Sequence, residues 1–182
     1  MSILLDIFGS TIIGGLIVLM LMNFNIFQSN TRFASDSELQ LQQNAKTLAE
    51  IINYDLRKIG YDYSNTAFVQ ADSERISFYS DIDRNGSSDV VSYFLGYASE
   101  VTETTNPKDR ILYRVVNSDT TKGPSLGLTK TKFSYLDEVY SETTTLTDIK
   151  YVRAELWIES IEPVGEEYLF TYWEMTINPR NL

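Results

Sequence analysis

The sequence predicts an α+β fold in which one long N-terminal helix packs on an antiparallel β-sheet. Residues 7–27 carry no charge, and residues 31–59 place apolar side chains at helical spacing. After Gly60, apolar and polar residues alternate with the period of a strand. The predicted parts are a transmembrane anchor helix, an amphipathic helix that continues it, and an antiparallel β-rich domain, over residues 1–29, 30–60 and 61–182.

The uncharged run is long enough to cross a bilayer. Its 21 residues, 7–27, extend about 30 Å as a helix, the thickness of the hydrocarbon core. One alternative is the core helix of a soluble protein, but the run is apolar on all sides and terminal. Another is a cleaved secretory signal, which would have a basic start and a small-residue cleavage site that this run lacks. We expect a retained, single-pass anchor in membrane lipid.

The start of the run carries the predicted assembly residues. Asp6 places a carboxylate at the membrane edge, where it either lies at headgroup level or meets a positive group of a neighbouring subunit. Ser10 and Gly14, and likewise Thr11 and Gly15, form small-xxx-small pairs that let another helix approach closely.

An amphipathic stripe continues the helix beyond the membrane. It consists of Leu41, Ala45, Leu48, Ile52, Leu56 and Ile59. The four polar residues 28–31 are the stretch where the helix could break, and Gly60 is the expected C-terminal cap. We expect the stripe to pack on the downstream domain, since it lacks the strict alternation of a coiled coil.

Strands are expected where the period becomes two. They cover residues 75–80, 90–95, 109–116, 130–136, 149–158 and 168–177. The last two should pair across the turn at residues 162–166. Residues 99–108, 118–125 and 142–147 are polar and are expected to be loops. Short sequential strands favour an antiparallel sheet, whose apolar face the helix stripe would cover.

An acidic loop joins the first two predicted strands. Its oxygen-bearing side chains at calcium-loop spacing are Asp81, Asp83, Asn85 and Asp89. Gly86 fits the required turn, but Ser92 stands where a bidentate glutamate would complete the site. The other interpretation is a hairpin turn, which Asn-Gly favours. We favour the turn with at most weak calcium binding, so Ca²⁺ is the only cofactor left open.

Composition excludes several classes of function. The net charge of −10, with no basic cluster to offset it, predicts that the chain does not bind nucleic acid. The absence of Cys and His excludes thiol catalysis, Ser-His-Asp triads and zinc sites of the usual kind. The carboxylates form no constellation suited to hydrolysis, and we expect no enzyme activity.

Together these features resemble the type IV pilin superfamily, nearest to the minor pilins and the type II secretion minor pseudopilins. The resemblance is carried by the helix end, from residues 44–46 through 55–61, and by the first hairpin, which consists of residues 76–78, the acidic loop and residues 91–93. Residues 123–126, 133–137 and 179–182 also fit. Pilins have an acidic residue at the fifth place of the mature chain, and Asp6 falls there if Met1 is removed, although pilins usually have Glu. The basic leader of pilins, which ends in Gly, is not seen here. We expect either a start further upstream or insertion without processing.

The resemblance implies a non-enzymatic structural subunit of a pilus-like or type II secretion-like assembly. The anchor would lie in the cytoplasmic (inner) membrane with the C-terminal domain extracytoplasmic. Its partners would be other pilin-like subunits or copies of itself, bound through the N-terminal helix. The alternative is a stand-alone, membrane-anchored binding domain that joins no filament.

Overall fold

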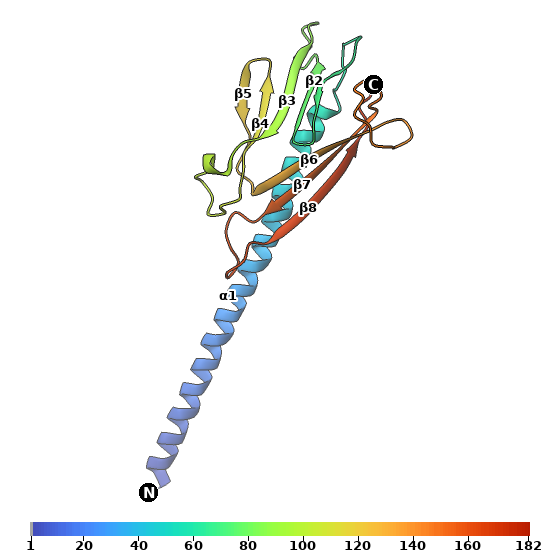
Figure 1. Ribbon diagram of the computed structural model, residues 1–182. Helices are drawn as coiled ribbons and strands as arrows, with labels where there is room; N and C mark the ends of the chain where they lie inside the picture. The colour runs from blue at the N-terminus through green and yellow to red at the C-terminus, as the bar shows by residue number, and fades with distance from the viewer. Residues whose placement is uncertain (1) are drawn as a thin grey trace. The chain divides into compact units, whose positions relative to one another are not determined.

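The computed structural model describes residues 2–182 and contains one long helix and eight strands (Figure 1). The helix is α1 (Ser2–Leu56), and a short 3₁₀ turn, η1, covers Ala98–Glu100. The strands are β1 (Phe68–Ala71), β2 (Arg75–Ser80), β3 (Asp89–Leu95), β4 (Leu112–Val116), β5 (Asp119–Lys122), β6 (Leu128–Leu136), β7 (Tyr151–Glu159) and β8 (Phe170–Ile177). The chain forms two compact units, Met1–Glu38 and Leu39–Leu182. The α+β class is confirmed.

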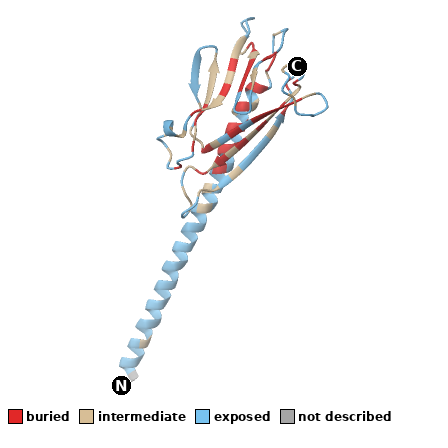
Figure 2. Cartoon of the chain, viewed as in Figure 1, coloured by how far each residue is buried: buried red, intermediate tan, exposed pale blue. Residues whose placement is uncertain are grey.

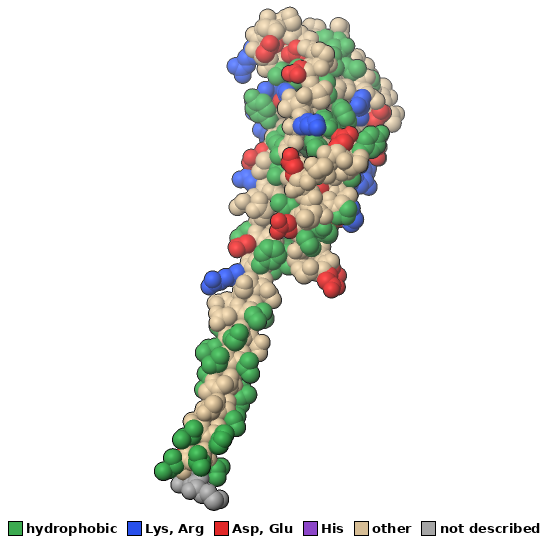
Figure 3. All heavy atoms as spheres, turned by 90° about the vertical axis from the view of Figure 1, so that its left-hand side faces the viewer, with side chains coloured by type: hydrophobic (Ala, Val, Ile, Leu, Met, Phe, Trp, Pro, Cys, Tyr) green, Lys and Arg blue, Asp and Glu red, His purple; other side chains and the backbone are tan. Residues whose placement is uncertain are grey.

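The first unit is helical, and its apolar side chains are exposed (Figure 2). On the face in Figure 3, hydrophobic side chains cover most of its length. Among the described residues, α1 is the one helix long and apolar enough to cross a membrane. A surface of this kind is unfavourable in water, so it needs lipid or other chains around it.

The helix does not break at the polar stretch. Thr31 donates its hydroxyl to the carbonyl of Phe27 at 2.9 Å, and α1 continues to Leu56. The predicted end at Ile59 is three residues too late, because turns replace the helix after Leu56. Gly60, the predicted cap, lies within these turns rather than directly after the helix, and its N–H bonds the carbonyl of Tyr79 at 2.9 Å; its φ of +76° is a conformation that glycine adopts without strain.

In the second unit, the strands form two antiparallel sheets rather than the single sheet that was predicted. Sheet A has the order β1-β2-β3-β4-β5, and sheet B has the order β6-β7-β8. Phe78 pairs with Val91 in sheet A, and Leu156 pairs with Trp173 in sheet B. The predicted pairing of the last two strands is confirmed.

One hydrophobic core joins the end of α1 to both sheets. All six predicted stripe residues are buried, and Leu48, Ile52 and Leu56 have no exposed surface. The end of α1 lies against one face of each sheet in Figure 1, and buried residues gather along that contact in Figure 2. Alternate residues of β7, from Val152 to Ile158, are buried as the predicted alternation requires.

Two short edge strands were not predicted. β1 and β5 each have four residues, and β5 lies inside the stretch predicted as a polar loop. Its sequence, Asp-Thr-Thr-Lys, has no apolar alternation, and all four residues are exposed. Such a strand is defined by hydrogen bonding to β4 rather than by burial, so its sequence gives no periodic signal.

Candidate functional sites

The predicted assembly residues lie on the exposed N-terminal part of α1. Ser10 and Thr11 donate their hydroxyls to the carbonyl of Ile7 at 2.9 and 2.8 Å. These polar groups are therefore satisfied within the helix and do not oppose contact with lipid or another helix. A Cβ atom added at Gly14 or Gly15 would meet nothing within 4 Å, so both positions leave room for a neighbouring backbone.

Helix geometry divides these residues between two faces. Each step of four residues advances about 40° around an α-helix, so Asp6, Ser10 and Gly14 lie within about 80° of one another. Thr11 and Gly15 lie about 140° and 180° from Asp6, on nearly the opposite side. The acidic residue therefore shares a face with one small-residue pair, and the second pair forms another close-approach surface.

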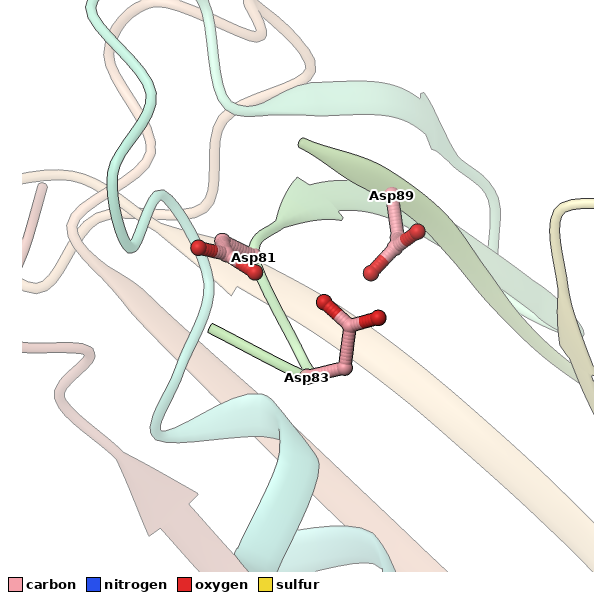
Figure 4. A group of neighbouring side chains, drawn as sticks. All are labelled: Asp81, Asp83 and Asp89. Carbon is pink, nitrogen blue, oxygen red and sulfur yellow. The ribbon is translucent and has the colours of Figure 1, made fainter. Parts of the chain in front are cut away.

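The acidic hairpin loop brings three carboxylates together between β2 and β3 (Figure 4). One oxygen each of Asp81, Asp83 and Asp89 lies within 4.8 Å of the others. Asp81 is buried, whereas Asp83 is exposed at the surface of the loop. The sequence therefore identified residues that the fold does place side by side.

The loop's own donors already hold these oxygens. Asp81 accepts the backbone N–H groups of Asn85 and Gly86 at 3.1 and 3.0 Å. Asp89 accepts the N–H of Ile82 at 3.2 Å, and the oxygen of the Asn85 amide accepts the N–H of Ser87 at 2.8 Å. These are local bonds of the Asx-turn type, and they close the loop.

The backbone hydrogen bonds of the loop also lower the pKa of Asp81. Burial by itself raises the pKa of the Asp81 carboxyl, but the backbone N–H groups of Gly86, Asn85 and Arg84 outweigh it and hold that pKa below its ordinary value. Ser92, at the place of the missing glutamate ligand, hydrogen-bonds Ser77 across the strands at 2.7 Å. The loop's own hydrogen bonds form the hairpin turn, and calcium binding at these carboxylates stays a prediction.

Sequence reasoning missed a buried ionic cluster between α1 and sheet A. Asp55, only 1% exposed, accepts hydrogen bonds at its Oδ2 atom from the Tyr93 hydroxyl at 2.7 Å and from Arg114 Nε at 2.5 Å. Its Oδ1 atom is buried without a hydrogen-bond partner among the described residues. Asp55 lies three residues after Ile52 on the buried side of the helix, and this was the signal that could have identified it.

The cluster shifts the pKa values of its members. Burial raises the pKa of the Tyr93 phenol well above its usual range, and the negative Asp55 raises it further. For Arg114, partial burial lowers the pKa, but the hydrogen bond and charge of Asp55 outweigh it, so the guanidinium pKa rises. Arg114 therefore stays charged, and the cluster ties the helix to β3 and β4.

Comparisons with protein-family models, with curated proteins and with solved structures gave no match to this chain. The chain can therefore be classified by its architecture. One long N-terminal apolar helix continues into a domain in which its end packs on antiparallel sheets, an arrangement compatible with a pilin-like fold.

Proposed function

We propose that this protein is a non-enzymatic structural subunit of a type IV pilus-like or type II secretion-like pseudopilus assembly. The observation that carries the proposal is the exposed apolar part of α1, in which Asp6 and two small-residue faces are combined on one helix. Within this proposal, the helix anchors the protein in the cytoplasmic membrane and the β domain is extracytoplasmic.

Helix-to-helix packing is the proposed mechanism. Gly14 and Gly15 lie on different faces of α1, so one subunit can contact a neighbour on each side, as a filament requires. In lipid, the Asp6 carboxylate gains most by meeting a positive group, such as the amino terminus of the next subunit. That pairing would set the stagger between adjacent subunits.

Membrane association is the first test of this proposal. The protein should stay with the membrane pellet after alkaline carbonate washing, because about 20 apolar residues are enough for integral insertion. Release into the supernatant would rule out both the anchor and the assembly that depends on it.

Cysteine cross-linking is the second test, because the chain has no cysteine of its own. A single cysteine at Gly14 or Met22 should capture a like subunit or a second pilin-like protein in native membranes. Val139, 77% exposed in the β domain, gives a control position that reports random collision. Cross-links no more frequent at Gly14 and Met22 than at Val139 would argue against the assembly.

Asp6→Asn tests the ion pair. It should leave the protein folded and in the membrane but reduce cross-linking at Gly14 several-fold. The matched control is Asp36→Asn, which removes an exposed charge from the same helix outside the apolar run. Equal cross-linking in both variants would contradict the role of Asp6 and favour the stand-alone anchored binding domain.

A further inference from the structure

Within the part of the chain that the structure describes, sheet B has one edge whose backbone is unpaired. The free side of β6 is partly closed, because Ser73 accepts the N–H of Phe133 at 2.8 Å and Tyr135 accepts that of Thr143 at 2.9 Å. β8 pairs with β7 on one side only, and among residues 2–182 its backbone makes no hydrogen bond to any other segment. Its outer N–H and C=O groups can therefore pair with another chain.

The free edge of β8 lacks the features that usually protect an edge strand. It has eight residues and a single charge, Glu174, whereas the opposite edge strand of the domain, β5, is short and polar. Phe170, Tyr172 and Trp173 are 58%, 41% and 38% exposed. Long, apolar edges of this kind are templates for strand addition.

A groove runs between the end of β8 and the last turns of α1. Residues Met175–Asn178 and Arg180 line one hollow together with Asn53 of α1 and Arg57 just after it, with a volume of about 310 Å³. A larger hollow of about 600 Å³ adjoins it and shares Asn53, Arg57 and Arg180. The last residues of β8 therefore border an open channel at the surface of the domain.

The charged side chains along this channel are three cations and one carboxylate, Glu50, which itself lies 3.7 Å from the Lys46 ammonium. Arg57, Lys58 and Arg180 line the channel, and none lies within 4.0 Å of a carboxylate of the described residues. Arg57 instead donates to the Asn53 side chain at 3.0 Å, and the Lys58 ammonium lies 3.8 Å from the centre of the Tyr54 ring. The three cations are gathered around one groove, which gives it a positive potential that favours an acidic ligand.

We propose that this groove binds an extended acidic segment of a partner protein, which adds a strand to the free edge of β8. Backbone hydrogen bonds to β8 would supply affinity, and Arg57, Lys58 and Arg180 would select carboxylate side chains. Trp173 and Met175, which share a face with Leu156 and Ala154, would offer apolar contact at the edge. This inference does not depend on membership of a filament.

Charge selectivity is tested by fluorescence anisotropy with the full chain in neutral detergent micelles. The probe is a labelled eight-residue peptide, Thr-Glu-Val-Glu-Thr-Glu-Val-Glu, and the comparison peptide has Lys in place of every Glu. The acidic peptide should bind and the basic one should not, and added salt should weaken binding. Equal binding of the two peptides would overturn the proposal.

Charge reversal locates the site. Arg180→Glu removes one attraction and adds one repulsion, so it should weaken binding of the acidic peptide at least about fivefold. Lys122→Glu makes the same change in net charge at an exposed position of sheet A, and it should change binding less than about twofold. Equal effects of the two variants would show that only net charge matters.

N-methylated peptides distinguish strand addition from simple charge attraction. Two versions of the acidic peptide carry N-methyl groups on either the odd or the even residues. Because alternate N–H groups of a strand point to the same side, one version should lose about tenfold or more in affinity and the other should be nearly unaffected. Equal binding of both would refute the added strand. Displacement of both peptides by phosphatidylserine vesicles, in a manner that depends on Arg180, would also refute it and would identify a lipid headgroup site instead.

Discussion

Arg114→Met should destabilise the β domain strongly, because it leaves Asp55 as a buried carboxylate without its cation. Asp55 is 1% exposed, and its Oδ1 atom has no partner among the described residues, so water cannot replace the lost guanidinium easily. Breaking a buried pair costs about 3–5 kcal/mol, and the 28% exposure of the Arg114 side chain places the expected loss at about 3 kcal/mol. For a domain of this size, that lowers the Tm by about 10 °C.

The assay is thermal unfolding of the full chain in detergent micelles, followed by tryptophan fluorescence. Both tryptophans, Trp157 and Trp173, belong to sheet B, so the signal reports the β domain and not the anchor. The matched control is Lys46→Met, which breaks a pair with Glu50 that is 68% exposed on each side and should cost less than about 0.5 kcal/mol.

A double variant distinguishes the loss of the ion pair from the cost of leaving the Asp55 carboxylate buried without a cation. Asp55→Leu combined with Arg114→Met removes both charges, and it should recover much of the stability, since a buried ion pair is often replaceable by apolar groups. The reasoning would be refuted if Arg114→Met cost no more than Lys46→Met, or if the double variant were less stable than the sum of the single changes.

Three further predictions concern the core and the acidic loop. Leu48→Asp places a charge at a fully buried position and should destabilise the domain by more than about 4 kcal/mol. Leu39→Asp, at a position 57% exposed, should be nearly neutral. Chemical denaturation measures both, and equal effects would show that the stripe is not part of the core. Calorimetric titration with Ca²⁺ should give at most millimolar-like affinity, and a micromolar dissociation constant abolished by Asp83→Ala would contradict the hairpin interpretation. The pKa of Asp81 is lowered in the folded state, so its stabilising contribution is complete above the unfolded-state pKa of about 3.9 and is lost as the pH falls through the lower folded-state pKa. Asp81→Asn should therefore reduce stability at neutral pH, and the variant should lose less stability than the parent as the pH falls below about 4. An unchanged acid unfolding curve would be evidence against the hydrogen bonds from the loop backbone to Asp81.

Local periodicity was enough to predict the helix and six of the strands. The spacing of Leu41 to Ile59 fixed which side of the helix is buried, and the alternation in β7 fixed which side of that strand faces the core. Both patterns repeat within one helix or strand. When one face of such an element is buried, its apolar residues recur with the period of that backbone, about 3.6 residues in a helix and two in a strand. The acidic loop was found for a similar reason, since its residues are close in the chain.

Pairing between distant segments was decided only by the tertiary structure. The division into two sheets, the strands β1 and β5, and the contact of Asp55 with Arg114 across 59 positions leave no local pattern. The groove joins the end of α1 to the end of β8 and the residues after it, and its three cations look like scattered surface charges in the sequence. Periodicity records whether a side chain is buried, but it does not record which partner buries it, and that choice depends on the packing of the whole domain.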